Sequence, residues 1–244
     1  MIIFYSYKYN NSRGESRRLL AQAISGYIEY RRAPGSVQAG TCKTIYADGR
    51  ISSVPAAELK STDAGKDASY AGRDASDEAA RLTAELRTAG EFGKPYRPGY
   101  APFSRSHSMN TWAVLILEPD DMTRYGSNDQ AGTDVLNCSC GLDIQYERKA
   151  NAVSIANRFF APEDAAVVRE LRDSVDGFFR LWARREALVK AIGTSVAATD
   201  IPSASGDAAE YQGVRYEILD AELQPDASDE PGACRLHAAI CIRR

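Results

Sequence analysis

The sequence predicts an α+β protein with two loosely similar halves. The expected elements run strand, helix and strands in the first part of the chain, and strand, helices and strands in the second. Grouped strands and helices of this kind are typical of α+β proteins. A polar, turn-rich segment at residues 118–134 (EPDDMTRYGSNDQAGTD) separates the two groups. We therefore expect an N-terminal half at residues 1–128 and a C-terminal half at residues 129–244.

The first half begins with a strand and a helix. Residues 1–9 (MIIFYSYKY) are rich in aromatic and branched side chains, which favour a strand. Residues 12–15 (SRGE) have the form of a capping box. They introduce a helix at residues 16–31, in which Leu20 and Ile24 recur at helical spacing.

The rest of the first half contains an expected insertion and one strong strand signal. Residues 33–80 are mostly small and polar and predict inserted loop material, interrupted by strand signals at residues 42–47 (CKTIYA) and 50–55 (RISSVP). Residues 91–103 (EFGKPYRPGYAPF) are broken by proline and glycine and predict a surface segment. The continuous apolar run at residues 111–118 (TWAVLILE) predicts a buried strand.

The second half starts and ends with strands. A strand is expected at residues 135–147, and two helices follow, split near Asp173, with Pro162 suited to the first turn of one of them. Two strands joined by a polar loop are expected at residues 211–223 and 234–244.

The composition indicates an ordinary globular protein. Of the 244 residues, 44% are hydrophobic and 26% are charged, which is enough apolar material for a core. The net charge of −3 gives no global basic field, so nucleic acid is not an expected partner. The N-terminus shows no basic region followed by a long apolar run, so we expect neither a secretory signal nor a membrane span. Five cysteines and two histidines do not suggest a disulfide framework or a structural zinc site, and we expect a reduced, cytoplasmic protein.

Polar side chains share one face of the strand expected at residues 141–147 (GLDIQYE). Apolar and polar residues alternate there, so a strand places Asp143 and Gln145 on one face, with Glu147 further along it. Oxygen ligands at this spacing suit a hard cation such as Mg²⁺. The alternative is a half-exposed strand with a solvated polar face.

An acidic residue lies on the apolar stripe of the helix expected at residues 178–193 (FFRLWARREALVKAIG). Glu186 falls near the centre of a stripe that includes Phe179 and Trp182, and Lys190 follows one turn later. A charged carboxylate in this place is costly without a cation. Two partners stay open: an ion pair with Lys190, or a metal ion shared with Asp143.

Residues 103–112 (FSRSHSMNTW) hold one of the two histidines. Ser106 and Ser108 flank His107 directly before the expected buried strand. Three short hydrogen-bonding side chains at the mouth of a strand suit a phosphate group. The alternative is a loop that contains a histidine by chance.

Taken together, three blocks resemble the 4'-phosphopantetheinyl transferase superfamily, specifically the monomeric type that activates surfactin synthetase and related carrier-protein systems. Residues 93–96 (GKPY) and 103–108 (FSRSHS) resemble the family's G-K-P and F-N-x-S-H-S motifs. Residues 141–145 (GLDIQ) resemble its G-x-D-x-E motif, and residues 178–190 (FFRLWARREALVK) its W-x-x-K-E-x-x-x-K motif. Residues 157–164 (NRFFAPED) fit the segment between the last two blocks.

The resemblance implies a pseudo-dimer of two similar α+β halves, with the active site and bound coenzyme A in the cleft between them. It implies that the 4'-phosphopantetheine arm of coenzyme A is transferred to a serine of an apo acyl, peptidyl or polyketide carrier protein, with release of 3',5'-ADP and with Mg²⁺ as cofactor. It also implies a monomer, with a basic and apolar patch beside the cleft to meet the acidic helix of the carrier protein.

The resemblance further assigns roles to single residues. Asp143 and Glu186 would hold Mg²⁺ against the diphosphate, and Glu186 would take the proton of the incoming serine hydroxyl. Lys190 would bind the phosphates and neutralise or protonate the departing one. Four more residues would bind coenzyme A, namely Arg17, Lys94, Ser106 and His107.

Two positions depart from the family pattern. Gln145 stands where many members have glutamate, so the site loses a charge, although the amide oxygen, a water or Glu147 could fill the place. Arg185 replaces a common lysine, and its planar guanidinium binds phosphate differently. The first departure leaves a second function open, a degenerate relative that binds coenzyme A without transferase activity.

A third function is weighed on the cysteines. Cys138 and Cys140 form a C-x-C motif, which together with His107 could serve a redox or metal-binding protein. Replacing both cysteines by serine would leave the function unchanged if the transferase interpretation is right.

Overall fold

The structure is a computed structural model of the chain. It describes residues 2–12, 14–32, 41–45, 51–53, 81, 84, 87–89, 94–96, 102–117, 140–171, 174–221 and 235–244. The expected boundary segment at residues 118–134 and Cys138 lie outside the described residues. So does the expected insertion, apart from two short strands.

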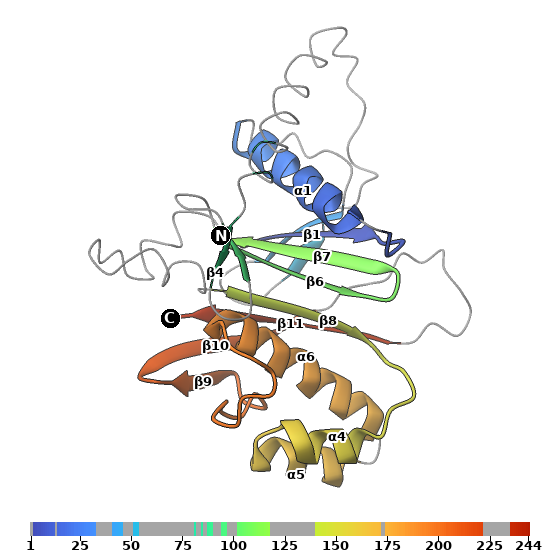
Figure 1. The fold of residues 1–244 in the computed structure, drawn as a ribbon, viewed down its shortest axis with the longest axis vertical. Coiled ribbons are helices and arrows are strands. Elements are labelled where there is room, and N and C mark those ends of the chain that lie inside the picture. Colours follow the sequence, from blue (N-terminus) through green and yellow to red (C-terminus); the bar gives the residue numbers. More distant parts are fainter. Residues whose placement is uncertain are drawn as a thin grey trace, which may run out of the picture.

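Two antiparallel sheets form the centre of the molecule (Figure 1). The first sheet has the strand order β3-β2-β1-β7-β6, and the second has the order β8-β11-β10-β9. The strands of the first sheet are β1 (Ile2–Lys8), β2 (Thr41–Ile45), β3 (Ile51–Ser53), β6 (Phe103–Ser108) and β7 (Thr111–Leu117). Those of the second are β8 (Cys140–Tyr146), β9 (Ala208–Tyr211), β10 (Val214–Ala221) and β11 (Leu236–Arg243). A separate pair consists of β4 (Arg87–Ala89) and β5 (Lys94–Tyr96).

Helices cover the outer faces of both sheets, which gives four layers (Figure 1). Helix α1 (Glu15–Arg32) lies on the first sheet, and helix α6 (Ser174–Ile192) lies on the second. The two sheets face each other across a third apolar core, which includes Leu115 of β7 and Leu142 of β8. Helices α4 (Ala152–Phe159) and α5 (Pro162–Glu170) pack against the start of α6. The expected α+β class is confirmed.

The two halves follow a related path. In each half, the first strand pairs with the last strand, β1 with β7 and β8 with β11, and a long helix of that half covers the outer face of its sheet. The strand predicted at residues 111–118 is confirmed as β7, which is apolar from Trp112 to Leu117, where both of its faces are buried. Trp112 faces the core under α1, and Leu115 faces the core between the sheets. The pseudo-dimer implied by the resemblance remains a prediction.

Three local expectations differ from the structure. Three helices, not two, follow β8, because the chain leaves helical conformation at Phe160 before Pro162 starts α5. The strand predicted at residues 211–223 is divided into β9 and β10 by a tight turn, in which Gln212 and Gly213 have positive φ angles of 51° and 77°. Residues 103–108 form a strand, β6, rather than a segment at the mouth of the strand that follows, β7.

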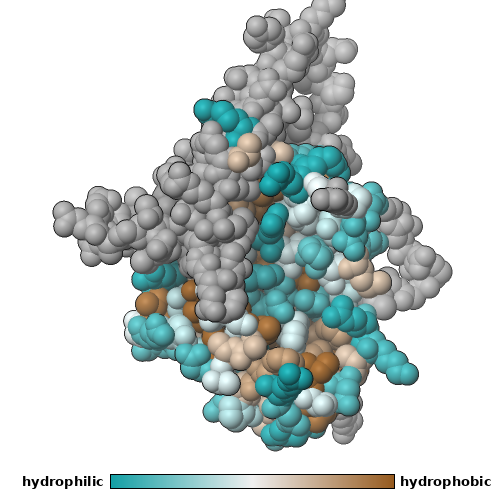
Figure 2. All heavy atoms as spheres, viewed as in Figure 1, coloured by the Kyte–Doolittle hydropathy of each residue, from teal (hydrophilic) through white to brown (hydrophobic). Residues whose placement is uncertain are grey.

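The surface differs between the two ends of the molecule. Apolar atoms are prominent over the part where α4, α5 and α6 lie, whereas the described surface near α1 is more polar (Figure 2). Among the described residues, no helix is both long enough and apolar enough to cross a membrane.

Candidate active site between a strand and a helix

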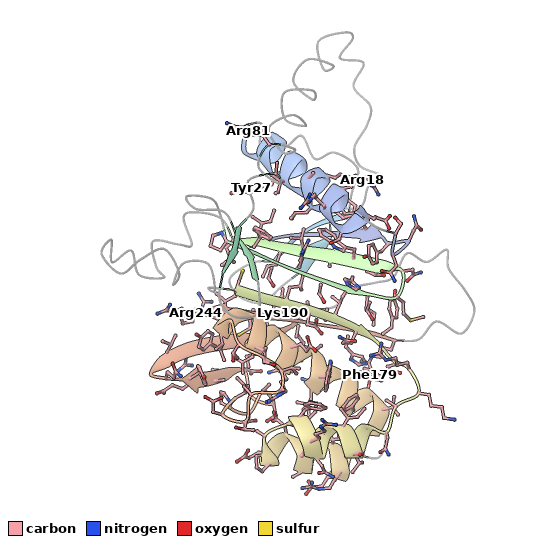
Figure 3. The ribbon with its side chains drawn as sticks, in the orientation of Figure 1. Arg18, Tyr27, Arg81, Phe179, Lys190 and Arg244 are labelled. Atoms are coloured by element: carbon pink, nitrogen blue, oxygen red, sulfur yellow. The ribbon has the colours of Figure 1, made fainter. Side chains whose placement is uncertain are left out.

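An ion pair links β8 to α6. Asp143 is 1% exposed on β8, and its Oδ1 atom accepts a hydrogen bond of 2.7 Å from Nζ of Lys190 on α6. Lys190 also donates to the backbone oxygen of Leu142 at 3.0 Å. Lys190 lies where α6 faces the strands (Figure 3). The structure therefore brings together two residues that the sequence placed on separate elements.

Glu186 precedes Lys190 by one turn of α6 and belongs to the same charged group. Its pKa is raised, first by burial and then by the negative charge of Asp143, and the charge of Lys190 acts in the opposite direction. A hydrogen bond from the Trp182 side chain also favours the ionised form. Lys190 pairs with Asp143 and its charge also acts on Glu186, and a further positive charge would favour the ionised form of Glu186.

Gly141 allows the helix to approach β8 closely. A Cβ atom at this position would lie 1.8 Å from the backbone oxygen of Ala187 and 2.8 Å from the backbone nitrogen of Ala191. Both alanines are fully buried. The helix backbone therefore rests directly on the strand, and this contact places Glu186 and Lys190 beside Asp143.

Both oxygens of Asp143 accept further hydrogen bonds. Its Oδ1 atom accepts from the hydroxyl of Ser106 at 2.7 Å, and its Oδ2 atom accepts from the side-chain nitrogen of Gln145 at 3.0 Å. Ser106 is buried on β6 and lies 3.2 Å from Nζ of Lys190. Asp143, Ser106 and Lys190 therefore form one hydrogen-bonded group that joins the two sheets and α6.

Two basic side chains, Arg105 and His107, lie on the face of β6 opposite to the serines. Burial lowers the pKa of His107, and the positive charges of Lys190 and Arg105 lower it further, while Asp143 opposes them. The ring centroid of His107 is 5.1 Å from that of Tyr9. Because like charges crowd this region, an anion would stabilise it.

Arg105 is a candidate that the sequence reasoning missed. It lies two positions before His107 on β6, and its Nη1 atom donates to the hydroxyl of Ser16 at 3.2 Å, at the start of α1. Burial lowers the pKa of Arg105, and the charge of Arg17 lowers it further. The alternation of residues along a strand was the signal that could have placed Arg105 beside His107.

The other expected coenzyme-binding residues are placed to different extents. Arg17 is exposed on the first turns of α1, close enough to influence Arg105. Lys94 belongs to β5, but its side chain lies outside the described residues.

Glu147 does not take part in the group around Asp143. Its Oε1 atom lies 2.8 Å from Nε2 of His237, the second histidine, which lies 3.6 Å from Asp176 at the start of α6. Arg235 donates to Asp176 at 2.5 Å and supplies positive charge to this separate cluster. The expectation that Glu147 could fill the place beside Gln145 is therefore wrong, because His237 on the neighbouring strand engages it.

Arg185 binds the chain rather than facing open solvent. It is 3% exposed, and its Nη2 atom donates to the backbone oxygens of Val196 and Ala198 at 3.3 and 3.1 Å. Its charge still acts on Glu186, whose raised pKa it lowers. Cys140 and Cys241 are buried free cysteines.

Comparison with known proteins finds a family match in the second half of the chain. Residues 139–230 match the family model of the 4'-phosphopantetheinyl transferase superfamily. A segment of 60 residues is 38% identical to the protein named 4'-phosphopantetheinyl transferase HetI from Nostoc sp. (strain PCC 7120), and covers 23% of this chain and 25% of that relative. The superfamily resemblance predicted from the sequence is confirmed, and the family match includes Asp143, Glu186 and Lys190.

Proposed function

We propose that this protein transfers the 4'-phosphopantetheine arm of coenzyme A to a serine of an apo acyl, peptidyl or polyketide carrier protein and releases 3',5'-ADP. One observation carries the proposal: Lys190 pairs with Asp143 and its charge also acts on Glu186, inside the segment that matches the superfamily. Two carboxylates close to each other and to positive side chains suit a site for a metal ion and a diphosphate.

Asp143 and Glu186 are the proposed ligands of Mg²⁺. The donor set fits a hard cation, because both groups are carboxylates, and the pKa of Glu186 is raised first by burial and then by the negative charge of Asp143. When bound, Mg²⁺ would neutralise charge on the diphosphate as the phosphoanhydride bond breaks. Gln145 lies beside Asp143 and supplies an amide where many superfamily members have an acid.

Glu186 is the proposed base. The pKa of Glu186 is raised toward neutral pH, and a general base works best when its pKa lies near the pH at which the enzyme operates. The hydroxyl of the carrier serine gives its proton to Glu186, its oxygen forms a bond to phosphorus, and the bond to the oxygen of 3',5'-ADP breaks. Lys190 lies one turn away and neutralises or protonates the departing phosphate.

Positive and hydroxyl side chains of residues 1–128, together with Lys190, form the proposed coenzyme site. His107 and Arg17 lie near Arg105. Lys94 is included among the proposed coenzyme-binding residues because of its sequence motif. Ser106 stays in the set because its hydroxyl is 3.2 Å from Nζ of Lys190, so a phosphate that reaches Lys190 also reaches Ser106.

A surface for the carrier protein is proposed on α5. Val167 and Leu171 are 37% and 41% exposed, four residues apart, and Arg169 is exposed between them. Val167 and Leu171 lie on the same side because they are four residues apart, and this apolar pair suits the apolar face of an amphipathic helix. Arg169 lies on another side and adds a positive charge nearby. We further propose that the protein acts as a monomer in the cytoplasm, with the coenzyme phosphates held by residues 1–128 and the metal by residues 129–244.

A labelled coenzyme A analogue tests the proposal. The protein is mixed with the analogue, Mg²⁺ and an apo carrier domain, and label on the carrier is measured. We expect transfer by the native protein, and Asp143→Ala should need far more Mg²⁺ and turn over slowly.

The second candidate function is coenzyme A binding without chemistry. It is favoured by one observation: the amide nitrogen of Gln145, rather than an acidic oxygen, faces Asp143. Label that binds the protein but never reaches any carrier would support this function and exclude the transferase.

A further inference from the structure

Three serines of β6 bind the backbone of β8. The hydroxyls of Ser104, Ser106 and Ser108 accept hydrogen bonds from the backbone amides of Leu142, Ile144 and Tyr146, at 2.9, 3.3 and 3.0 Å. All three serines are buried. Each pair is separated by 38 positions in the chain, so both strands advance by two residues at every step. We call these three pairs the serine ladder.

The serine ladder joins two sheet edges. β6 is the last strand of the first sheet, and β8 is the first strand of the second. The amides of β8 at alternate positions therefore have no neighbouring strand in their own sheet on that side. A buried amide without an acceptor is costly. Because the serine hydroxyls meet this need only in one register, they fix how far β8 can slide along β6.

The middle pair of the serine ladder belongs to the charged group. The hydroxyl of Ser106 accepts from Ile144 and donates to Asp143, and it lies beside Lys190. His107, between Ser106 and Ser108, points to the opposite face of β6. The register of the serine ladder therefore sets the position of His107 relative to Asp143.

We infer that Ser104 and Ser108 are positioning residues, which hold the strand of His107 in register with the strand of Asp143 through the backbone of β8. The kinetic consequence of this inference rests on the proposed function. The structural part, which is the protection of two backbone amides from exchange, is independent of that function. Neither hydroxyl bonds to Asp143 or Lys190 in the structure, so both act through the strand and not on the reacting groups.

Amide hydrogen exchange tests the geometry. In Ser104→Ala, the amide of Leu142 should exchange at least about tenfold faster, and in Ser108→Ala the amide of Tyr146 should do so. Ser104→Thr and Ser108→Thr keep the hydroxyl and should restore the protection. Ser203→Ala is the matched control, because it removes a hydroxyl bonded to buried Asp164 outside the serine ladder. Unchanged exchange at both amides would overturn the inference.

Transfer kinetics test the positioning role. The double variant Ser104→Ala/Ser108→Ala should lose about tenfold in kcat/KM, with a higher Mg²⁺ requirement, while Ser203→Ala with a similar loss of thermal stability keeps its kinetics. Equal kinetic loss in both would reduce the serine ladder to a general stabilising feature and overturn the role. A native protein that transfers no label contradicts the proposed function and with it the kinetic role of Ser104 and Ser108. The exchange experiment then still tests whether the serine ladder holds β6 and β8 in register.

Discussion

Nζ of Lys190 lies 2.7 Å from Oδ1 of Asp143, a carboxylate 47 positions earlier in the chain. This ion pair ties α6 to β8 at the level where Gly141 lets the helix rest on the strand. Glu186 is the second carboxylate near this ion pair, and its pKa is raised first by burial and then by the charge of Asp143. The site therefore combines a demand for a cation with a neighbouring cluster of positive side chains.

Replacing Lys190 should separate stability from catalysis. Lys190→Met leaves buried Asp143 without its ion pair, and we expect the free energy of unfolding to fall by about 3 kcal/mol and transfer to fall at least about 100-fold. The double variant Asp143→Asn/Lys190→Met should recover most of the stability but none of the transfer. Chemical denaturation and label transfer measure the two effects. Recovery of transfer in the double variant would contradict the role of Lys190.

Glu186→Gln should abolish transfer and alter the pH dependence of stability. We expect transfer to fall at least about 100-fold, the usual contribution of a general base. Because the pKa of Glu186 is raised in the folded protein, its contribution to stability is fully present below its usual pKa of 4.5 and is lost as the pH rises through the raised value. Without Mg²⁺, the variant should therefore be more stable than the native protein at neutral pH, and the two should converge in acid.

Added Mg²⁺ supplies the control for Glu186. Mg²⁺ should stabilise the native protein more than Glu186→Gln, because the variant lacks one proposed ligand. The difference in stability between the two proteins should therefore become smaller. Thermal unfolding with and without the metal measures this directly. A variant that turns over like the native protein would show that another group takes the serine proton.

Gly141→Ala should displace α6 from β8 and thereby disturb the site. The new Cβ would collide with the backbone of α6, so we expect a loss of about 1–3 kcal/mol in the free energy of unfolding and a clear loss of transfer. Gly206→Ala is the matched control, because its nearest neighbour, the backbone oxygen of Ala208, would be 3.6 Å away. Equal stability of the two variants would mean that the helix does not need this close approach.

His107 should report the arrival of phosphate. Its pKa is lowered by burial and then by Lys190 and Arg105, so its contribution to stability is present above its usual pKa of 6.5 and is lost as the pH falls through the lowered value. Bound 3',5'-ADP should raise the pKa of His107, because its phosphates offset those positive charges. NMR titration measures the shift, and His107→Gln identifies the resonance, since the chain has two histidines. Binding of 3',5'-ADP without any change at His107 would contradict its place in the coenzyme site.

Arg105→Ala should weaken coenzyme binding more than catalysis. Loss of one charged hydrogen bond to phosphate should raise the KM for coenzyme A about tenfold and leave kcat nearly unchanged. Arg158→Ala on the exposed side of α4 removes the same charge away from β6 and serves as the control. The transfer assay measures the KM for coenzyme A of both variants. An unchanged KM for Arg105→Ala would show that Arg105 does not bind coenzyme A.

The sequence by itself determined the face that Asp143, Gln145 and Glu186 occupy. The unbroken apolar run of β7 predicted a strand buried on both sides, the alternation in β8 placed Asp143 and Gln145 together, and the apolar stripe of α6 marked Glu186 as an inward carboxylate. These features depend on the periods of a strand and a helix, which are local properties of the chain.

Only the tertiary structure decided which partner each of these residues meets. His237 engages Glu147, the serine ladder fixes β6 against β8, and Lys190 pairs with Asp143, and each of these contacts joins elements distant in sequence. A period of two or of 3.6 residues tells which side of an element faces inward, but not which element packs against it. That choice depends on how the sheets and helices stack, and hence on contacts that no local pattern contains.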